Sequence, residues 1–331
     1  MQTRRRPPLR LALALLLLFA MTACAAPTSS ADATATFPSP VTESAPSATA
    51  TRTPAPPTST PPPTITQLPI SPTPSLQSPI PPFLFAIPIP AEFRTFIDPS
   101  YRYATTAGGT REPHNGVEFL NSLGTPVLAA ADGVVLFAGD DFANGSPYSP
   151  RGWYAFYGNF IIIEHQITNY ELPVYTLYAH LSQVLTTTGA AVHAGDEIGL
   201  IGFTGAAVGS HLHFEVRYGG TTYEDSRNPE LWLQPHAGSG TLAGNISDTN
   251  GGKMPIIAIQ IRALDVVHPT QYITTYEEAA RSGQPPFNEN FAIGELPAGS
   301  YEITFVAYQL ETIIVEIRDG EMTFLTITVG K

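Results

Sequence analysis

From about residue 83 onward, the apolar residues of the chain come in short segments in which they alternate with polar ones. Glycine-rich turns separate the segments, and no long stretch shows the apolar period of a helix. Alternation of this kind is typical of half-buried strands. The clearest segments are residues 126–130, 134–138, 159–165, 174–178, 198–201 and 211–218. The pattern predicts an all-β fold, with a long loop over residues 140–158 that could shape a binding groove.

A glycine-rich stretch at residues 237–252 is the predicted boundary between two β domains, 83–236 and 237–331. Strands are predicted to resume after this stretch, at 301–308 and 312–317, and a hairpin turn is predicted at Asp319-Gly320. In the final segment Leu325, Ile327 and Val329 share one face, which indicates a half-buried antiparallel sheet. The simplest arrangement is a small β-sandwich.

The first 82 residues have the composition of a leader and a tether. Arg4, Arg5 and Arg6 precede an apolar run at residues 11–20, which predicts a secretory signal over residues 1–23. Residues 25–82 hold 16 prolines in 58 residues. A segment so rich in Pro, Ser, Thr and Ala cannot bury a core, which predicts a disordered stalk over residues 24–82.

Cys24 is the only cysteine of the chain, so no intrachain disulfide can form. Its position directly after Thr22-Ala23 resembles the lipobox of bacterial lipoproteins, in which the cysteine is lipidated and becomes the mature N-terminus. The resemblance implies an extracytoplasmic protein that a lipid on Cys24 anchors to the cell envelope. An ordinary cleaved signal with a chance cysteine is the alternative interpretation.

The charge of the chain argues against nucleic acid as a partner. Removal of the signal takes away Arg4, Arg5, Arg6 and Arg10 but no acid, so 12 of the 16 basic residues remain against 28 acidic ones, a net charge of −16. Phosphate backbones and anionic lipid headgroups bind basic surfaces. No such surface is expected here.

Histidines provide the strongest indication of chemistry. His211 and His213 stand two residues apart in a predicted strand, so their side chains are expected on one face. His114 and Glu118 lie four residues apart, and His180 follows in the segment 178–181. Two imidazoles and one carboxylate form the ligand set of a catalytic zinc with one position open. A single buried histidine is more often hydrogen-bonded to a backbone carbonyl than bound to a metal, so each histidine taken alone favours a structural role. The other four histidines lack partners at ligand spacing and are interpreted as structural or surface residues: His165, His193, His236 and His268.

The segment 111–217 resembles the M23 zinc metallopeptidases of the lysostaphin/LytM type. The first family motif, a histidine and an aspartate four residues apart before Gly-Thr-Pro-Val, corresponds to His114, Glu118 and residues 124–127. The Tyr-x-His-Leu motif is present at residues 178–181. The segment Thr-Gly-x-x-x-Gly-x-His-Leu-His spans residues 204–213.

The resemblance implies a role for each of these residues. His114, Glu118 and His213 would bind Zn²⁺, and His180 and His211 match the non-ligand pair that activates water and stabilises the tetrahedral intermediate. It also implies an M23-type antiparallel β-sheet catalytic domain and a zinc-dependent endopeptidase that cuts peptides of bacterial cell-wall peptidoglycan. The protein is expected to be a monomer.

Position 118 departs from the family pattern, because the family has aspartate where this chain has glutamate. Glutamate binds zinc, but its extra methylene moves the carboxylate unless the backbone adjusts. The alternative function is therefore a catalytically weak or inactive M23-like lipoprotein that binds the wall or activates an amidase.

Two further resemblances concern the accessory parts of the chain. The stretch from residue 240 through residues 292–301 resembles the carboxypeptidase-regulatory-like β-sandwich, usually an accessory module, so no chemistry is assigned to it. Residues 127–135 and 195–202 also resemble biotinyl and lipoyl carrier domains. Such carriers need a lysine for the prosthetic group, and the chain has only Lys253 and Lys331, both outside that region. The carrier interpretation therefore fails.

Overall fold

The computed structural model describes residues 83–106, 110–142, 146–150, 152–168, 170–277 and 281–330. These residues form strands joined by loops and two short 3₁₀ helices, η1 (Tyr223–Asp225) and η2 (Pro229–Leu231), which confirms the predicted all-β fold. The predicted signal, Cys24 and the stalk lie outside the described residues. Within the described part of the chain, no helix is long and apolar enough to cross a membrane.

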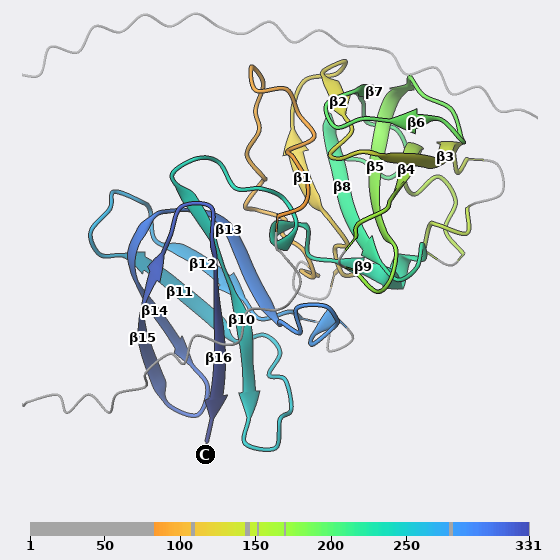
Figure 1. Ribbon diagram of the computed structural model, residues 1–331. Helices are drawn as coiled ribbons and strands as arrows, with labels where there is room; N and C mark the ends of the chain where they lie inside the picture. Colours follow the sequence, from red (N-terminus) through yellow and green to blue (C-terminus); the bar gives the residue numbers. More distant parts are fainter. Residues whose placement is uncertain are drawn as a thin grey trace, which may run out of the picture. The chain divides into compact units, whose positions relative to one another are not determined.

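Residues 117–227 contribute the strands of one nine-stranded sheet (Figure 1). Its central order is β1-β8-β5-β4-β3-β6, with β7 also paired to β5, β2 to β7 and β9 to β8; all these pairs are antiparallel. The strands are β1 (Val117–Leu120), β2 (Pro126–Leu128), β3 (Gly133–Asp140), β4 (Asn159–His165), β5 (Val174–Val184), β6 (Ala191–Val192), β7 (Glu197–Ile201), β8 (His211–Tyr218) and β9 (Ser226–Arg227). β4 and β8 begin and end where the sequence predicts them, whereas β5 continues six residues past the predicted end at residue 178.

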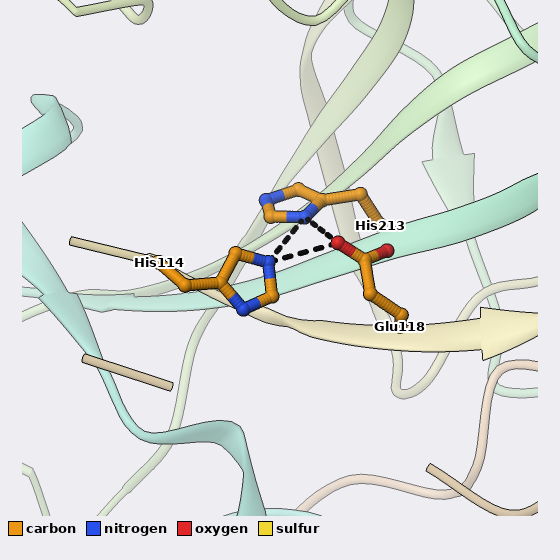
Figure 2. Close-up of side chains that lie close together, drawn as sticks. All are labelled: His114, Glu118 and His213. Atoms are coloured by element: carbon orange, nitrogen blue, oxygen red, sulfur yellow. Dashed lines mark hydrogen bonds and ion pairs between the residues drawn. The ribbon is translucent and has the colours of Figure 1, made fainter. Parts of the chain in front are cut away.

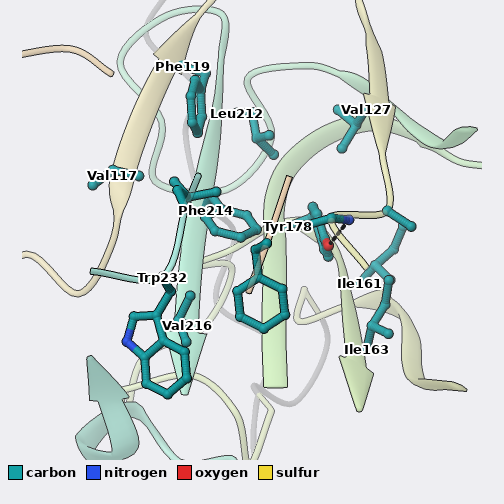
Figure 3. Close-up of a cluster of buried hydrophobic side chains, with 14 of the residues drawn as sticks. Val117, Phe119, Val127, Ile161, Ile163, Tyr178, Leu212, Phe214, Val216 and Trp232 are labelled. Carbon is teal, nitrogen blue, oxygen red and sulfur yellow. Dashed lines mark hydrogen bonds between the residues drawn. The ribbon is translucent and has the colours of Figure 1, made fainter. Parts of the chain in front are cut away.

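One face of this sheet packs on the main apolar core. Figure 3 shows side chains of β1, β4, β5 and β8 meeting there around Phe214 and Tyr178. β8 contributes Leu212, Phe214 and Val216, each fully buried. Burial of such side chains stabilises a fold by about 1.5–3 kcal/mol each, so this face fixes the register of β8.

The opposite face of the sheet is covered by the predicted long loop between β3 and β4. Asp141, 1% exposed, organises the loop. Its carboxylate accepts hydrogen bonds from the Ser149 hydroxyl and from the backbone amides of Phe156, Tyr157 and Gly158 at 2.7–3.0 Å. Tyr157 then joins a second, smaller apolar cluster with side chains of β4 and β5. The loop is therefore packed onto the sheet at residues 156–158.

The C-terminal part consists of two sheets. One has the order β13-β10-β16 and the other β12-β11-β14-β15. The strands are β10 (Ser239–Asp248), β11 (Ala258–Ala263), β12 (Gln271–Thr274), β13 (Phe291–Pro297), β14 (Gly299–Val306), β15 (Leu310–Ile317) and β16 (Met322–Val329). A single apolar cluster draws residues from both sheets, among them Ile246, Tyr301 and Leu325, as expected for a small β-sandwich.

Three details of the C-terminal part differ from the sequence prediction. Strand β10 lies inside the glycine-rich stretch 237–252, because its glycines allow close strand approach: a Cβ at Gly244 would lie 2.2 Å from the Leu325 carbonyl. The turn at Asp319-Gly320 does not join a hairpin, because β15 pairs with β14 and β16 pairs with β10. The β10–β16 pair is parallel, so this sheet is mixed.

The predicted alternation of β16 is confirmed, with Leu325 and Val329 buried and Thr326 and Thr328 exposed.

His165 of β4 has a structural role in the main core. Its Nδ1 donates to the Asp132 carbonyl at 2.8 Å, and its Nε2 lies 2.7 Å from the Thr176 hydroxyl, in hydrogen-bond contact. Thr176 in turn lies 2.9 Å from the Tyr178 hydroxyl, which accepts from the Ala130 amide. Burial lowers the pKa of His165 to about 4, although the hydrogen bond to Asp132 acts in the opposite direction.

Because the folded chain keeps His165 neutral, we expect the protein to lose stability in acid. The unfolded chain binds this proton near pH 6.5 and the folded chain only near pH 4, so stability falls as the pH drops through this window. We expect His165→Asn, which removes the titrating ring, to reduce the difference in unfolding free energy between pH 7.5 and pH 4.5 by about 2–3 kcal/mol. Urea unfolding of both proteins with a chelator present measures this difference. An equal pH dependence in the two proteins would contradict the assignment.

Candidate metal centre

Strand β8 divides its side chains between core and site. Its apolar residues face the main core, and its polar residues form a row on the opposite face. The polar row consists of His211, His213, Glu215 and Arg217. β1 pairs with β8 so that Glu118 lies directly opposite His213, and β5 places Ala179 opposite His213 on the other side. Side chains from three neighbouring strands can therefore meet at His213.

Three of the predicted site residues come together there, with atoms close enough to share one ion (Figure 2). His114 Nε2 lies 2.8 Å from Glu118 Oε1 and 3.3 Å from His213 Nδ1, and His213 Nδ1 lies 3.1 Å from Glu118 Oε1. All three residues are buried, between 5% and 7% exposed. Sequence-distant residues thus form one compact set of donor atoms.

The loop before β1 holds His114 in place. Its backbone carbonyl accepts from the Ala104 amide at 2.7 Å, and the ring of Tyr101 stacks on the imidazole at 3.9 Å between centroids. Gly116 makes this arrangement possible, because a Cβ there would lie 2.8 Å from His213 Cε1 and 2.4 Å from the Phe214 carbonyl. The absence of a side chain at position 116 thus leaves the space that the His213 ring occupies.

The electrostatics of the cluster favour a positive charge at its centre. Burial by itself would raise the pKa of Glu118, but the charge of His213 and the contacts with the three histidines hold this pKa well below its usual value. Burial opposes protonation of His213, yet the charge of Glu118 and hydrogen bonds to Glu118 and Glu215 raise its pKa to about 9. The carboxylates of Glu118 and Glu215 thus favour a positive charge at this point of the cluster.

His180 reaches the site through a distortion of β5. Its neighbour Ala179 faces the site side, so a regular strand would turn His180 toward the core. Instead His180 has φ +63° in a region where the pairing of β5 shifts register, and its ring lies 5.6 Å from that of His213. Nδ1 donates to the Thr204 carbonyl at 2.8 Å. Burial, together with the neighbouring charges of His213 and His211, lowers the pKa of His180 to about 3, so this ring is neutral at pH 7.

His211 lies beside His180, with 4.9 Å between the ring centroids. Its Nδ1 donates to the Gly209 carbonyl at 2.9 Å. Its Nε2 lies 3.0 Å from Glu118 Oε2, in an ion-pair contact that lacks the alignment of a hydrogen bond. All five predicted site residues therefore lie together: three form the compact donor set, and His180 and His211 flank it.

The donor set fits a zinc ion. Two imidazole nitrogens and one carboxylate oxygen are the ligands of many catalytic zinc sites. Tetrahedral bonds of about 2.1 Å place ligand atoms about 3.4 Å apart, and the three observed separations lie within about 0.6 Å of that value. In addition, Glu215 Oε1 accepts from His213 Nε2 at 3.0 Å, which leaves Nδ1 to present its lone pair to the centre.

The site also contains residues that sequence reasoning missed. Glu215 and Arg217 continue the polar row of β8, and Tyr157 reaches them from the long loop. Alternation along β8 already placed positions 215 and 217 on the face of His213, so the signal was present for these two. Of the other four histidines, none joins the cluster within the described residues. His165 is buried in the core, His193 is exposed, and His236 pairs with Glu295.

The comparisons with known proteins relate the segment around the candidate metal centre to one protein family. Residues 112–225 match the profile described as Peptidase family M23. The match includes Glu118, His180 and the polar row of β8. The similarity to peptidase family M23 therefore covers residues 112–225, the segment that holds the candidate metal centre.

Individual relatives share this segment. The chain is 38% identical over 104 residues to the peptidoglycan DD-endopeptidase ShyA of Vibrio cholerae, which covers 31% of this chain and 20% of ShyA. It is 38% identical over 107 residues to the DD-carboxypeptidase/endopeptidase Mpg of Neisseria meningitidis, covering 32% and 20% of the two chains. The chain thus spans about a fifth of the length of these relatives. Among solved structures, the catalytic domain of lysostaphin from Staphylococcus simulans is similar at 30% identity and a TM-score of 0.29, over 35% of this chain and 76% of that domain.

Proposed function

We propose that the chain is a zinc-dependent endopeptidase that hydrolyses peptide bonds in bacterial cell-wall peptidoglycan. The observation that carries the proposal is the convergence of His114, Glu118 and His213 within the M23 domain, with two further histidines beside them. The substrate class follows from the names of the relatives, which act on peptidoglycan.

In this proposal His114, Glu118 and His213 hold the zinc ion. Zinc supplies a Lewis acid that polarises the scissile carbonyl and makes water more acidic. His180 and His211 each donate from Nδ1 to a backbone carbonyl, so Nε2 is the nitrogen of each ring that is left for proton transfer. Nε2 of His211 lies 3.0 Å from Glu118 Oε2. One Nε2 would accept the proton of the attacking water, and the other, when its ring is protonated, would donate to the oxyanion that develops on the carbonyl.

We further infer that the protein works outside the cytoplasm, tethered to the envelope by a lipid on Cys24. This part of the proposal is supported by the leader composition, the lipobox-like Thr22-Ala23-Cys24 and the proline-rich segment that follows. A tether of this kind would let an anchored domain reach its substrate in the wall.

Glu118 favours a second candidate function. A glutamate where the M23 pattern has aspartate is compatible with a domain that binds the wall, or activates an amidase, with weak or no catalysis. Against this alternative, the carboxylate still lies within 3.1 Å of the other two donors, and the His180 and His211 pair is complete.

Incubation of the purified full-length chain with purified peptidoglycan tests the proposal. We expect soluble fragments with new free amino groups, no cleavage after treatment with a chelator, and recovery when Zn²⁺ is added back. Mass spectrometry of the fragments identifies the bond that is cut. A zinc-loaded protein that sediments with peptidoglycan but releases no fragment would overturn the enzymatic function in favour of the wall-binding one.

A further inference from the structure

A buried polar network lies behind His213, on the side away from Glu118. Glu215 Oε1 accepts from His213 Nε2 at 3.0 Å and from the Tyr157 hydroxyl at 2.5 Å, and Glu215 Oε2 accepts from Arg217 Nε at 2.8 Å. Arg217 Nη2 donates to the Tyr157 hydroxyl at 2.8 Å, and Nη1 donates to the Thr221 carbonyl. Glu215, Arg217 and Tyr157 are each 0% exposed. The network is closed, and it contacts the metal cluster through His213.

Stability of the fold does not account for this network. Two charges removed from water are costly, and a buried ion pair is often no more stabilising than apolar side chains of similar volume. The neighbours on this face are apolar: β5 places Leu177 opposite Glu215 and Tyr175 opposite Arg217. Apolar residues at 215 and 217 could therefore pack here, and the charged pair calls for another explanation.

The network contacts the His213 ring at Nε2 and thereby bears on the orientation of this ring. An imidazole can present either nitrogen, and rotation of the ring exchanges their positions. The carboxylate of Glu215 accepts a hydrogen bond from Nε2, so Nδ1 is the nitrogen that faces His114 and Glu118 and can present its lone pair there. Tyr157 and Arg217 hold both oxygens of Glu215, so the carboxylate cannot turn away.

We propose that Glu215 is a positioning residue for the metal ligand His213, and that Tyr157 and Arg217 hold Glu215 in place. The long loop thereby takes part in metal binding, because Asp141 accepts hydrogen bonds from the backbone amides of Tyr157 and its neighbours. The inference deepens the proposed function, on which it rests for the identity of the metal as zinc.

Zinc affinity of the full-length chain is the measurement, made with ZnCl₂ in competition with a chromogenic chelator. Glu215→Gln keeps the shape of the side chain, but its amide nitrogen cannot accept from Arg217. We expect its zinc dissociation constant to rise about 10–100-fold. Tyr157→Phe removes a single hydroxyl from the network, and we expect a rise of about 10-fold.

Tyr178→Phe is the matched control. Tyr178 is also 0% exposed, and its hydroxyl also has two partners, Thr176 and the Ala130 amide, but these lie in the main core on the other face of the sheet. We expect its zinc affinity to stay within about twofold of wild type even if it melts at a lower temperature. Thermal unfolding with a chelator present reports the folding of each variant.

The outcomes separate this inference from the proposed function. Tyr157→Phe and Glu215→Gln with wild-type zinc affinity would overturn the positioning role, even in a chain that cuts peptidoglycan. An equal loss of affinity in Tyr178→Phe and Tyr157→Phe would also overturn it, because a general loss of stability would then explain both. If Glu215→Gln does not fold, Tyr157→Phe decides. A wild-type chain that binds zinc without cutting overturns the proposed function alone.

Discussion

Replacement of His213 by alanine is expected to abolish zinc binding and peptidoglycan cleavage together. The change removes one of three donor atoms and leaves Glu118 and Glu215 facing each other without the imidazole between them. Zinc content, measured by metal analysis, should fall from about one ion per chain to near zero. Cleavage should fall to below about a thousandth of the wild-type rate, because the Lewis acid is lost.

His211→Ala is the control for this prediction, since it removes a histidine two residues away on the same strand face. We expect this variant to keep most of its zinc while its turnover falls by about 100-fold or more, because His211 lies beside the donor set and, in the proposed function, takes part in proton transfer. Equal zinc loss in the two variants would reverse the assignment of ligand and catalytic histidine.

Glu118→Ala should have an effect of similar size. The Glu118 carboxylate lies within 3.1 Å of His114, His211 and His213, and it is the only acid of the donor set. Its removal leaves two imidazoles to share the ion without an anionic ligand. We expect zinc affinity to fall by about 100-fold or more, with activity at or near background. Chelator competition and fragment release measure the two losses.

Glu118→Asp distinguishes an adapted enzyme from an inactive relative. The glutamate already reaches all three histidines from β1, so the shorter side chain should fall short of them. A displacement of about 1 Å is expected to lower activity by about 100-fold. A wild-type chain that neither binds zinc nor cuts peptidoglycan, alongside an aspartate variant that does both, would identify the natural protein as a binding module.

Periodicity explains why much of the first domain could be predicted from sequence. Alternation along residues 211–218 requires a strand with one apolar and one polar face, and the structure has both. The five site residues lie on or beside strands whose alternation or motif spacing was visible. The roles that the family resemblance implies for these residues indicated that they lie close together, and periodicity alone could not, because it does not give the strand order.

Features that depend on local backbone distortion or on distant partners were not predictable in this way. His180 reaches the site through a left-handed backbone conformation that a regular strand pattern does not encode. The glycine-rich stretch 237–252 indicated a domain boundary, but it contains β10, whose Gly244 allows the close approach of β16. Asp319-Gly320 has the composition of a hairpin turn, yet whether the following strand pairs locally or crosses to another sheet depends on which face it must bury.

β8 has one apolar and one polar face, so the metal ligands meet only when this strand pairs in the correct register. Side chains alternate with a period of two, so a slip of β8 by one residue would turn Leu212 and Phe214 toward the site and His213 toward the core. Such a misaligned sheet could still be compact, but it would have no second imidazole opposite Glu118. The β1–β8 pair also joins residues 95 positions apart in the chain, a contact that is slow to form. A chain that binds an ion between Glu118 and His213 has therefore formed the sequence-distant β1–β8 pair in the native register.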